Sequence, residues 1–186
     1  LFADSIYLHI FDSNITSNNS YLGGGIAIND TLCDITNSSI KENSAGTFEL
    51  DPNQPYQYAE YGSGGGIAAF SSLLDIFDST ITENTAKAAG GGIALDGDWW
   101  IQPSLKPIIS NCLITKNSAG QQGGGVAALY YAKPEIENCT IADNAVSLED
   151  GFGGGIAAYF NAIVNVVNSI IWNNIGANGS QLASYT

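Results

Sequence analysis

The sequence predicts an all-β solenoid, a parallel β-helix of about six coils with three short strands in each coil. Two recurring motifs and the absence of any helical periodicity predict this fold. The first motif is a glycine triplet followed by Ile or Val and then Ala. It occurs at residues 23–27, 64–68, 90–94, 123–127 and 153–157. Its copies start 41, 26, 33 and 30 residues apart, which is a solenoid spacing.

The second motif lies between the triplets and ends in asparagine. Its copies end at Asn18, Asn43, Asn84, Asn117, Asn144 and Asn174. Three residues earlier the residue is always Ile, five earlier it is Ser or Cys, and six earlier it is Asp or Asn. Eight residues earlier it is Ile or Val. Because six copies agree at five positions, we interpret them as equivalent positions in six coils.

Each position of this motif has a physical interpretation. Apolar residues two apart, such as Leu74 and Ile76, form one face of a strand. Asp or Asn tolerates a left-handed turn, so the chain bends there and the small residue and Ile then face inward. The final asparagine makes another corner, where stacked side chains can form a hydrogen-bonded ladder. At about 4.8 Å per coil, six coils would form a rod roughly 25–30 Å long.

These columns also place the three cysteines. Cys112 and Cys139 share the small inward position with serines, and Cys33 lies in an apolar column ten residues before Asn43. We therefore expect buried free thiols, since buried Cys behaves as a small hydrophobe. A disulfide between Cys112 and Cys139 is the alternative.

The whole chain, residues 1–186, is predicted to form one domain, with loop insertions at 44–63 and 96–108. Insertions in solenoids commonly build the binding surface. The chain begins inside a coil, and neither a new triplet after Asn174 nor a capping helix is visible. Open ends expose strand edges. This predicts either further coils of the same polypeptide or end-to-end self-association.

Composition limits the partners. The chain carries 18 acidic residues, five lysines and no arginine, for a net charge of −13. Nucleic acids and anionic membrane surfaces are therefore disfavoured, whereas glycans and other proteins are compatible partners. The sequence contains no run of about 18 apolar residues, so we expect no membrane insertion. Low charge and abundant Asn, Ser and Thr indicate an extracellular or cell-surface location.

Catalytic and metal-binding patterns are largely missing. His9 is the only histidine, so it forms no triad or zinc site. Asp34 and Asp75 share an outward column with Glu135, but Ile108 interrupts it. We expect no catalytic residue, no metal site and no cofactor. A structural Ca²⁺ bound by acidic turns such as 96–98 would be the exception, although such sequences are ordinary turns.

Aromatic residues give a stronger functional signal. They follow the third strand in successive coils, at Trp99, Trp100, Tyr130, Tyr131 and Tyr159, with Phe160 beside the last. Such an edge can stack on sugar rings or pack against a protein. The alternative is that these rings only anchor the loop. We therefore treat the five as candidate ligand-binding residues for a glycan or a protein.

Two further surface features are expected. The alanines after the triplets (Ala27, Ala68, Ala94, Ala127 and Ala157) would face outward, either as a flat packing stripe or because a tight corner admits nothing larger. Six Asn-x-Ser/Thr sequences occur. Those at Asn18, Asn37 and Asn138 fall in structural columns, whereas Asn14, Asn29 and Asn178 are candidate glycan acceptors.

The triplets, together with sequences such as 40–43 (Ile-Lys-Glu-Asn) and 81–84 (Ile-Thr-Glu-Asn), resemble right-handed parallel β-helix repeats of the pectin-lyase-like superfamily. Bacterial extracellular repeat proteins and polymorphic outer-membrane protein passengers are the most similar groups. This chain has Ile where the outer-membrane family has Phe, and a third Gly for its Ala.

The resemblance implies a right-handed helix on which lyases, hydrolases, adhesins and fibres all occur. The lyases typically use a basic residue near Ca²⁺, and this chain has no arginine. Our first hypothesis is a non-enzymatic extracellular structural or adhesive protein, either a surface adhesin or a subunit of a fibrous assembly. The alternative is a polysaccharide-binding or polysaccharide-cleaving module that uses the aromatic edge.

Overall fold

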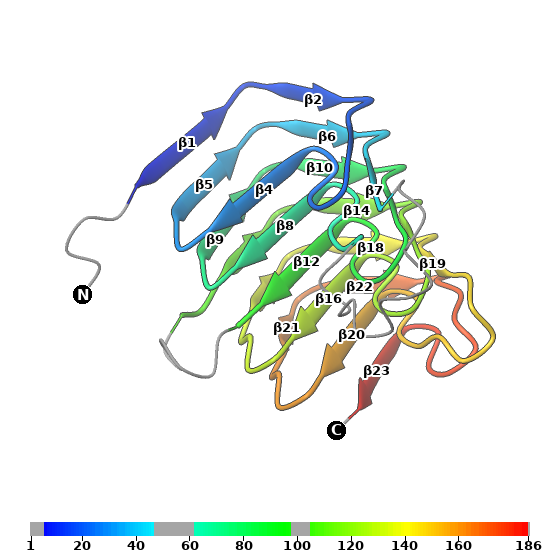
Figure 1. Ribbon diagram of the computed structural model, residues 1–186. Helices are drawn as coiled ribbons and strands as arrows, with labels where there is room; N and C mark the ends of the chain where they lie inside the picture. Colours follow the sequence, from blue (N-terminus) through cyan, green and yellow to red (C-terminus); the bar gives the residue numbers. More distant parts are fainter. Residues whose placement is uncertain (1–5, 47–61, 98–104, 186) are drawn as a thin grey trace.

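Four parallel β-sheets wrap around one core and form a parallel β-helix (Figure 1). The computed structural model describes residues 6–46, 62–97 and 105–185. Sheet A contains β1 (Tyr7–Phe11), β5 (Leu32–Thr36), β9 (Leu73–Phe77), β13 (Ile108–Ser110), β17 (Glu135–Glu137) and β21 (Asn165–Val167). Sheet B contains β2 (Asn14–Thr16), β6 (Ser39–Lys41), β10 (Thr80–Thr82), β14 (Leu113–Thr115), β18 (Thr140–Ala142) and β22 (Ile170–Trp172).

The other two sheets complete each coil. Sheet C contains β3 (Asn19–Ser20), β7 (Ser44–Ala45), β11 (Thr85–Ala86), β15 (Ser118–Ala119) and β19 (Ala145–Val146). Sheet D contains β4 (Ile26–Asn29), β8 (Ile67–Phe70), β12 (Ile93–Asp96), β16 (Val126–Leu129), β20 (Ile156–Tyr159) and β23 (Leu182–Tyr185). The chain therefore passes through sheets A, B, C and D before it starts the next coil.

The predicted β-helix is confirmed, and the structure adds one short strand to each of the first five coils. Sheet C is made of two-residue strands that follow the asparagine corner, for example Ala86 opposite Ala119. The sequence analysis expected three strands per coil, because two residues are too few to show a period-2 pattern. Hydrogen bonds to the neighbouring coils, and not an alternating sequence, hold these residues extended.

The apolar columns stack in register along the axis. In sheet A, Ile35 lies opposite Ile10 and Ile76, and in sheet B, Ile81 lies opposite Ile40 and Ile114. Inward side chains of these strands and of sheet D form one continuous core. Most of them are fully buried, so the hydrophobic effect favours this register over a one-residue slip.

The asparagine corners form a hydrogen-bonded ladder through the core. Asn84 shows the repeating pattern: its Nδ2 donates to Asn117 Oδ1 at 3.0 Å and to the carbonyl of Ile40 at 2.9 Å. Its backbone N–H donates to the same Asn117 oxygen at 3.0 Å. The Nδ2–Oδ1 bond recurs at 2.9–3.0 Å from Asn18 to Asn43, Asn43 to Asn84, Asn84 to Asn117, Asn117 to Asn144 and Asn144 to Asn174. The buried amides are thereby satisfied.

A second ladder lies at the corner between sheets A and B. The backbone N–H of Ser38 donates to Ser79 Oγ at 3.1 Å, and that of Cys139 donates to Ser169 Oγ at 3.0 Å. Cys112 joins the series through its N–H, which lies 3.4 Å from Cys139 Sγ. The thiols thus take the role of serine hydroxyls. All three cysteines are buried and free, as expected, and burial raises the pKa of the Cys33 thiol to about 11.

The third glycine of each triplet leaves space for the asparagine ladder. A Cβ placed on Gly92 would lie 2.7 Å from the carbonyl oxygen of Gly125 and 3.1 Å from Asn117 Nδ2. Real Cβ atoms do not tolerate the first of these contacts. The glycine and the asparagine of the next coil are therefore one structural unit.

Four of the five alanines that follow the triplets face out of the coil and yet are buried, whereas Ala27 is exposed as expected. Ala68, Ala94, Ala127 and Ala157 are 0–1% exposed. The residues that precede the triplets pair with one another above them, for example Gln122 with Ala89 and with Phe152. A Cβ on Gly153 would lie 2.8 Å from the Cβ of Ala157. The tight-corner alternative therefore explains these four alanines, and they form no stripe open to a partner.

A degenerate sixth copy of the triplet closes the last coil. Leu182 pairs with Ile156 and Ala183 with Ala157, so residues 179–183 (Gly-Ser-Gln-Leu-Ala) occupy the place of a triplet. Gly179 has φ +69°, like the first glycine of the other copies. The sequence analysis missed this copy because two of its three glycines are replaced. Among the described residues, no helix is long and apolar enough to span a membrane.

We expect Asn117→Ala to lower the free energy of unfolding by about 3 kcal/mol, because the change leaves the buried donors of Asn84 unpaired. Urea denaturation measures this loss. Asn14→Ala is the control, since Asn14 is exposed on β2, and it should stay within about 0.5 kcal/mol of the wild type. A loss below about 1 kcal/mol for Asn117→Ala would show that the ladder contributes little.

Candidate functional site

Six aromatic side chains gather at one edge of the helix, where sheet D ends and the chain turns toward sheet A. We call them the aromatic corner: Tyr130, Tyr131, Phe152, Tyr159, Phe160 and Tyr185. Tyr130 and Tyr131 follow β16, and Tyr159 and Phe160 lie at the end of β20. Because parallel strands end at the same edge, successive coils bring these rings together.

The rings of the aromatic corner form a continuous array. Tyr130 packs edge-on against Tyr159, with ring centroids 5.9 Å apart, and lies 5.7 Å from Phe160. Tyr131 meets Phe160 at 6.1 Å in a T-shaped arrangement. Phe152 lies 6.1 Å from Tyr159 and stacks on Tyr185 at 5.5 Å. All of these distances are typical of favourable aromatic pairs.

Exposure differs across the array. Phe152 is buried, Tyr130, Tyr131 and Tyr159 are half-buried, and Phe160 and Tyr185 are 43% and 64% exposed. The buried ring anchors the array to the helix, while the outer rings present apolar surface to solvent. This combination of a fixed base and an open face suits a binding surface.

The backbone at the corner adopts an unusual conformation. Tyr130, Tyr131 and Phe160 have φ values of +37°, +66° and +49°. Bulky residues rarely adopt positive φ, and turns of this kind favour Asn and Gly. Asp30 and Ser71, small polar residues, occupy the corresponding turns of earlier coils. The turn therefore does not require an aromatic residue.

The structure thus brings together three of the five predicted binding residues: Tyr130, Tyr131 and Tyr159. Trp99 and Trp100 lie outside the described residues. The sequence analysis missed Phe152 and Tyr185 as members of this site. Phe152 directly precedes a glycine triplet and Tyr185 follows the degenerate copy, so only the alignment of that copy with the others could have revealed their proximity.

The three candidate glycan acceptors lie on the surface. Asn14 is exposed on β2, and Asn29 is exposed on β4 with its Nδ2 donating to Asp30 Oδ2 at 3.0 Å. Asn178 is exposed, and its Nδ2 donates to the carbonyl of Asp150 at 3.3 Å.

Three outward carboxylates of sheet A lie against neighbouring groups of the protein. Asp34 lies opposite Asp75 in the sheet, and Asp34 Oδ1 is 2.7 Å from His9 Nδ1. Asp75 Oδ1 accepts the backbone N–H of Ile108 at 2.9 Å, where the chain enters β13. Glu135 Oε1 lies 3.4 Å from Lys106 Nζ. Within the described ranges, no group of three or more His, Cys, Asp or Glu side chains is arranged to hold a metal ion.

Asp75→Asn should increase stability at neutral pH. Burial raises the pKa of the Asp75 carboxyl, so the folded state holds its proton more tightly than the unfolded state. Stability from this group is therefore complete below the unfolded pKa and declines as the pH rises through the folded pKa.

Asparagine keeps an oxygen acceptor for Ile108 and carries no charge. We expect a gain of less than about 1 kcal/mol at pH 7, because partial exposure screens the charge. The gain should vanish in acid, below the carboxyl's unfolded pKa. Urea denaturation of both proteins at the two pH values tests this. A gain that persists in acid would contradict the electrostatic explanation.

Comparison with known proteins agrees with the geometry. Residues 100–185 match the family model described as the right handed beta helix region. No curated protein and no solved structure was found to match the chain. The matched family covers both enzymes and non-enzymes. The chain is a parallel β-helix repeat protein, and its C-terminal part is similar to the right-handed β-helix family.

Proposed function

We propose that this chain is a non-enzymatic adhesive β-helix of the cell surface or extracellular space, which binds a glycan at the aromatic corner. One observation carries the proposal: Tyr130, Tyr131 and Phe160 are aromatic, although each has a positive φ, a conformation that disfavours bulky side chains. Such local strain is most often kept at positions where a side chain is needed for function.

Rigidity supports the same function. The turns that hold Tyr131 and Phe160 are joined by a backbone hydrogen bond of 3.2 Å between these two residues. Stacked coils beneath them keep the rings in place, so little conformational entropy is lost on binding. The pyranose face of a sugar is apolar and stacks on such rings.

Charge favours a neutral glycan over an acidic one. With a net charge of −13, the chain repels anionic polysaccharides at long range. Cleavage of the glycan is the less favoured alternative, because Asp34 already lies beside His9 and Asp75 already accepts the N–H of Ile108. Retaining or inverting hydrolysis requires two carboxyl groups free to face the substrate.

Tyr131→Asn tests the proposal. Asparagine fits the left-handed turn, so the strain that is relieved should offset the lost contact with Phe160. We expect the free energy of unfolding to stay within about 1 kcal/mol of the wild type. Binding to neutral glycans, measured on an array that also carries acidic glycans, should fall at least about tenfold, a loss of about 1.4 kcal/mol.

Phe11→Ser is the matched control, because Phe11 is exposed on β1, away from the aromatic corner. It removes an aromatic surface residue and should leave binding unchanged. If the aromatic rings only anchor the chain, Tyr131→Asn will instead lower stability by more than about 2 kcal/mol and leave no specific binding to lose. That result would overturn the proposal.

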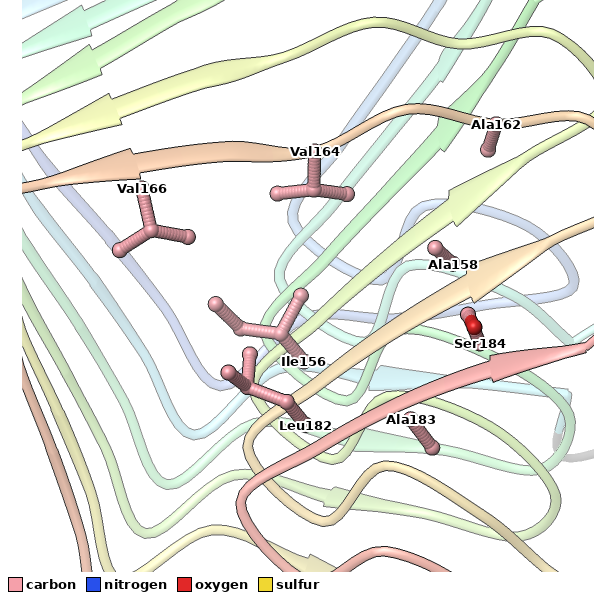
Figure 2. A pocket seen from close by; sticks show the side chains of 8 residues that line it. All are labelled: Ile156, Ala158, Ala162, Val164, Val166, Leu182, Ala183 and Ser184. Carbon is pink, nitrogen blue, oxygen red and sulfur yellow. The ribbon is translucent and has the colours of Figure 1, made fainter.

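A subunit of a fibrous assembly is the second candidate, and one observation favours it. A hollow of about 490 Å³ lies between Val164 and Val166 on one side and Ile156 and Leu182 on the other (Figure 2). In the same coil, Ile170 and Trp172 on the outer face of β22 are 62% and 64% exposed. Uncovered apolar surface of this kind commonly marks a contact site.

A further inference from the structure

Gln181 occupies a position at which each of the five other coils has glycine. The pairing of Leu182 with Ile156 aligns Gln181 with Gly155. The third glycines of the five complete triplets are Gly25, Gly66, Gly92, Gly125 and Gly155. Gln181 is therefore the point at which the last coil departs from the repeat.

Glycine is needed at this position wherever another coil follows. A Cβ on Gly66 would lie 2.7 Å from the carbonyl oxygen of Gly92 and 3.1 Å from Asn84 Cγ. On Gly125 it would lie 2.7 Å from the carbonyl oxygen of Gly155 and 3.0 Å from Asn144 Nδ2. The Cβ of Gln181 therefore stands where the backbone and the asparagine of an added coil would lie.

The Gln181 amide also replaces the contacts that an added coil would make. Asn174 Nδ2 donates to Gln181 Oε1 at 2.9 Å, and the backbone N–H of Asn174 points to the same oxygen at 3.5 Å. In return, Gln181 Nε2 donates to the carbonyl of Asn174 at 3.3 Å.

In the preceding coil, these three groups have partners from the next coil. The N–H and Nδ2 of Asn144 donate to Asn174 Oδ1, both at 2.9 Å. The carbonyl of Asn144 accepts the N–H of Ile175 at 2.8 Å. One glutamine side chain thus satisfies all three groups of Asn174 that a further coil would otherwise satisfy.

Without Gln181, the two ends of the helix would match. Asn18 starts the ladder of the described residues and donates to Asn43, as Asn174 would donate to the next asparagine. The inward columns also correspond, since Ile10 and Val166 belong to one column, as do Ile15 and Ile171. A second copy stacked head to tail would bring Asn18 Oδ1 to the donors of Asn174.

We propose that Gln181 is an end cap that prevents a second copy of this chain from adding head to tail in ladder register. The block is steric at the Cβ and chemical at the amide. Exposed strand edges invite such addition, and natural β-proteins protect them by local devices of this kind. The inference is independent of glycan binding. It argues against a fibre in which copies of this chain stack head to tail in ladder register.

Two variants separate the two parts of the cap. Gln181→Ala keeps the Cβ and removes the amide, whereas Gln181→Gly removes both. Sedimentation velocity over a wide concentration range should show wild type and Gln181→Ala as monomers. The weight-average mass of Gln181→Gly should at least double as concentration rises. A wild type that stacks head to tail, or a Gln181→Gly that stays monomeric, overturns the steric block.

Side-chain amide exchange by NMR tests the chemical part without requiring association. In Gln181→Ala, the Nδ2 protons of Asn174 should exchange at least about tenfold faster than in the wild type, because their acceptor is lost. Those of Asn117, two coils before Asn174 in the ladder, should keep their protection. Unchanged exchange at Asn174 would show that Gln181 does not cap the ladder.

Discussion

Every other feature of this β-helix depends on the asparagine ladder. A chain that coils around a dry core must turn at corners where backbone groups face the interior, and these groups need partners. Each asparagine supplies two donors and an acceptor at the same corner of successive coils, as Asn84 does for Ile40 and Asn117. Pairing is complete only when consecutive coils lie in register, so the ladder also sets the alignment of the apolar columns.

The ladder determines the rest of the repeat through packing. An asparagine in one coil fills the space above the third glycine of the previous coil, as Asn117 does above Gly92. The first glycine then turns back over the following alanine, which leaves no room for a larger side chain. These constraints explain why the asparagine and the glycine triplet recur together in successive coils, although they lie far apart in the chain. The turn after sheet D is not bound by these constraints, since Asp30, Ser71, Tyr130 and Phe160 all occupy it in different coils.

The aromatic corner uses that freedom. Tyr131 and Phe160 follow strands whose ends the ladder has already fixed, so the rings lie 6.1 Å apart with no direct contribution from neighbouring sequence. The positive φ of both residues costs stability locally. Packing of the coils around the continuous core offsets this cost. A rigid scaffold that holds strained aromatic side chains is a sound basis for recognition.

The coil that contains Gln181 treats polar and apolar groups differently. At the C-terminal end, Gln181 satisfies Asn174 and closes the corner near sheet C, whereas the hollow beside Val164 leaves the apolar core open. One end surface is thus capped for polar groups and uncapped for apolar groups. Hydrogen-bond geometry is directional and can be blocked by one side chain, while apolar surface is covered only by area.

The sequence by itself determined the coils, the inward Ile columns and the asparagine corners. Identical residues recur once per coil at these positions, so a column such as Ile40, Ile81 and Ile114 can be recognised without knowing the spacing between coils. The buried thiols followed from the same columns. Periodic positions are predictable because each coil imposes the same local requirement.

Only the tertiary structure decided the two-residue strands of sheet C, the covering of the alanines, the addition of Phe152 and Tyr185 to the aromatic corner, and the role of Gln181. The first three depend on contacts between different coils whose separation in sequence varies, and the role of Gln181 depends on its alignment with Gly155 of the preceding coil. The Gln181 cap is the clearest case, because nothing near Gln181 in the sequence distinguishes it from an ordinary polar residue. Its meaning comes from Asn174, which the end of the coil places within 2.9 Å.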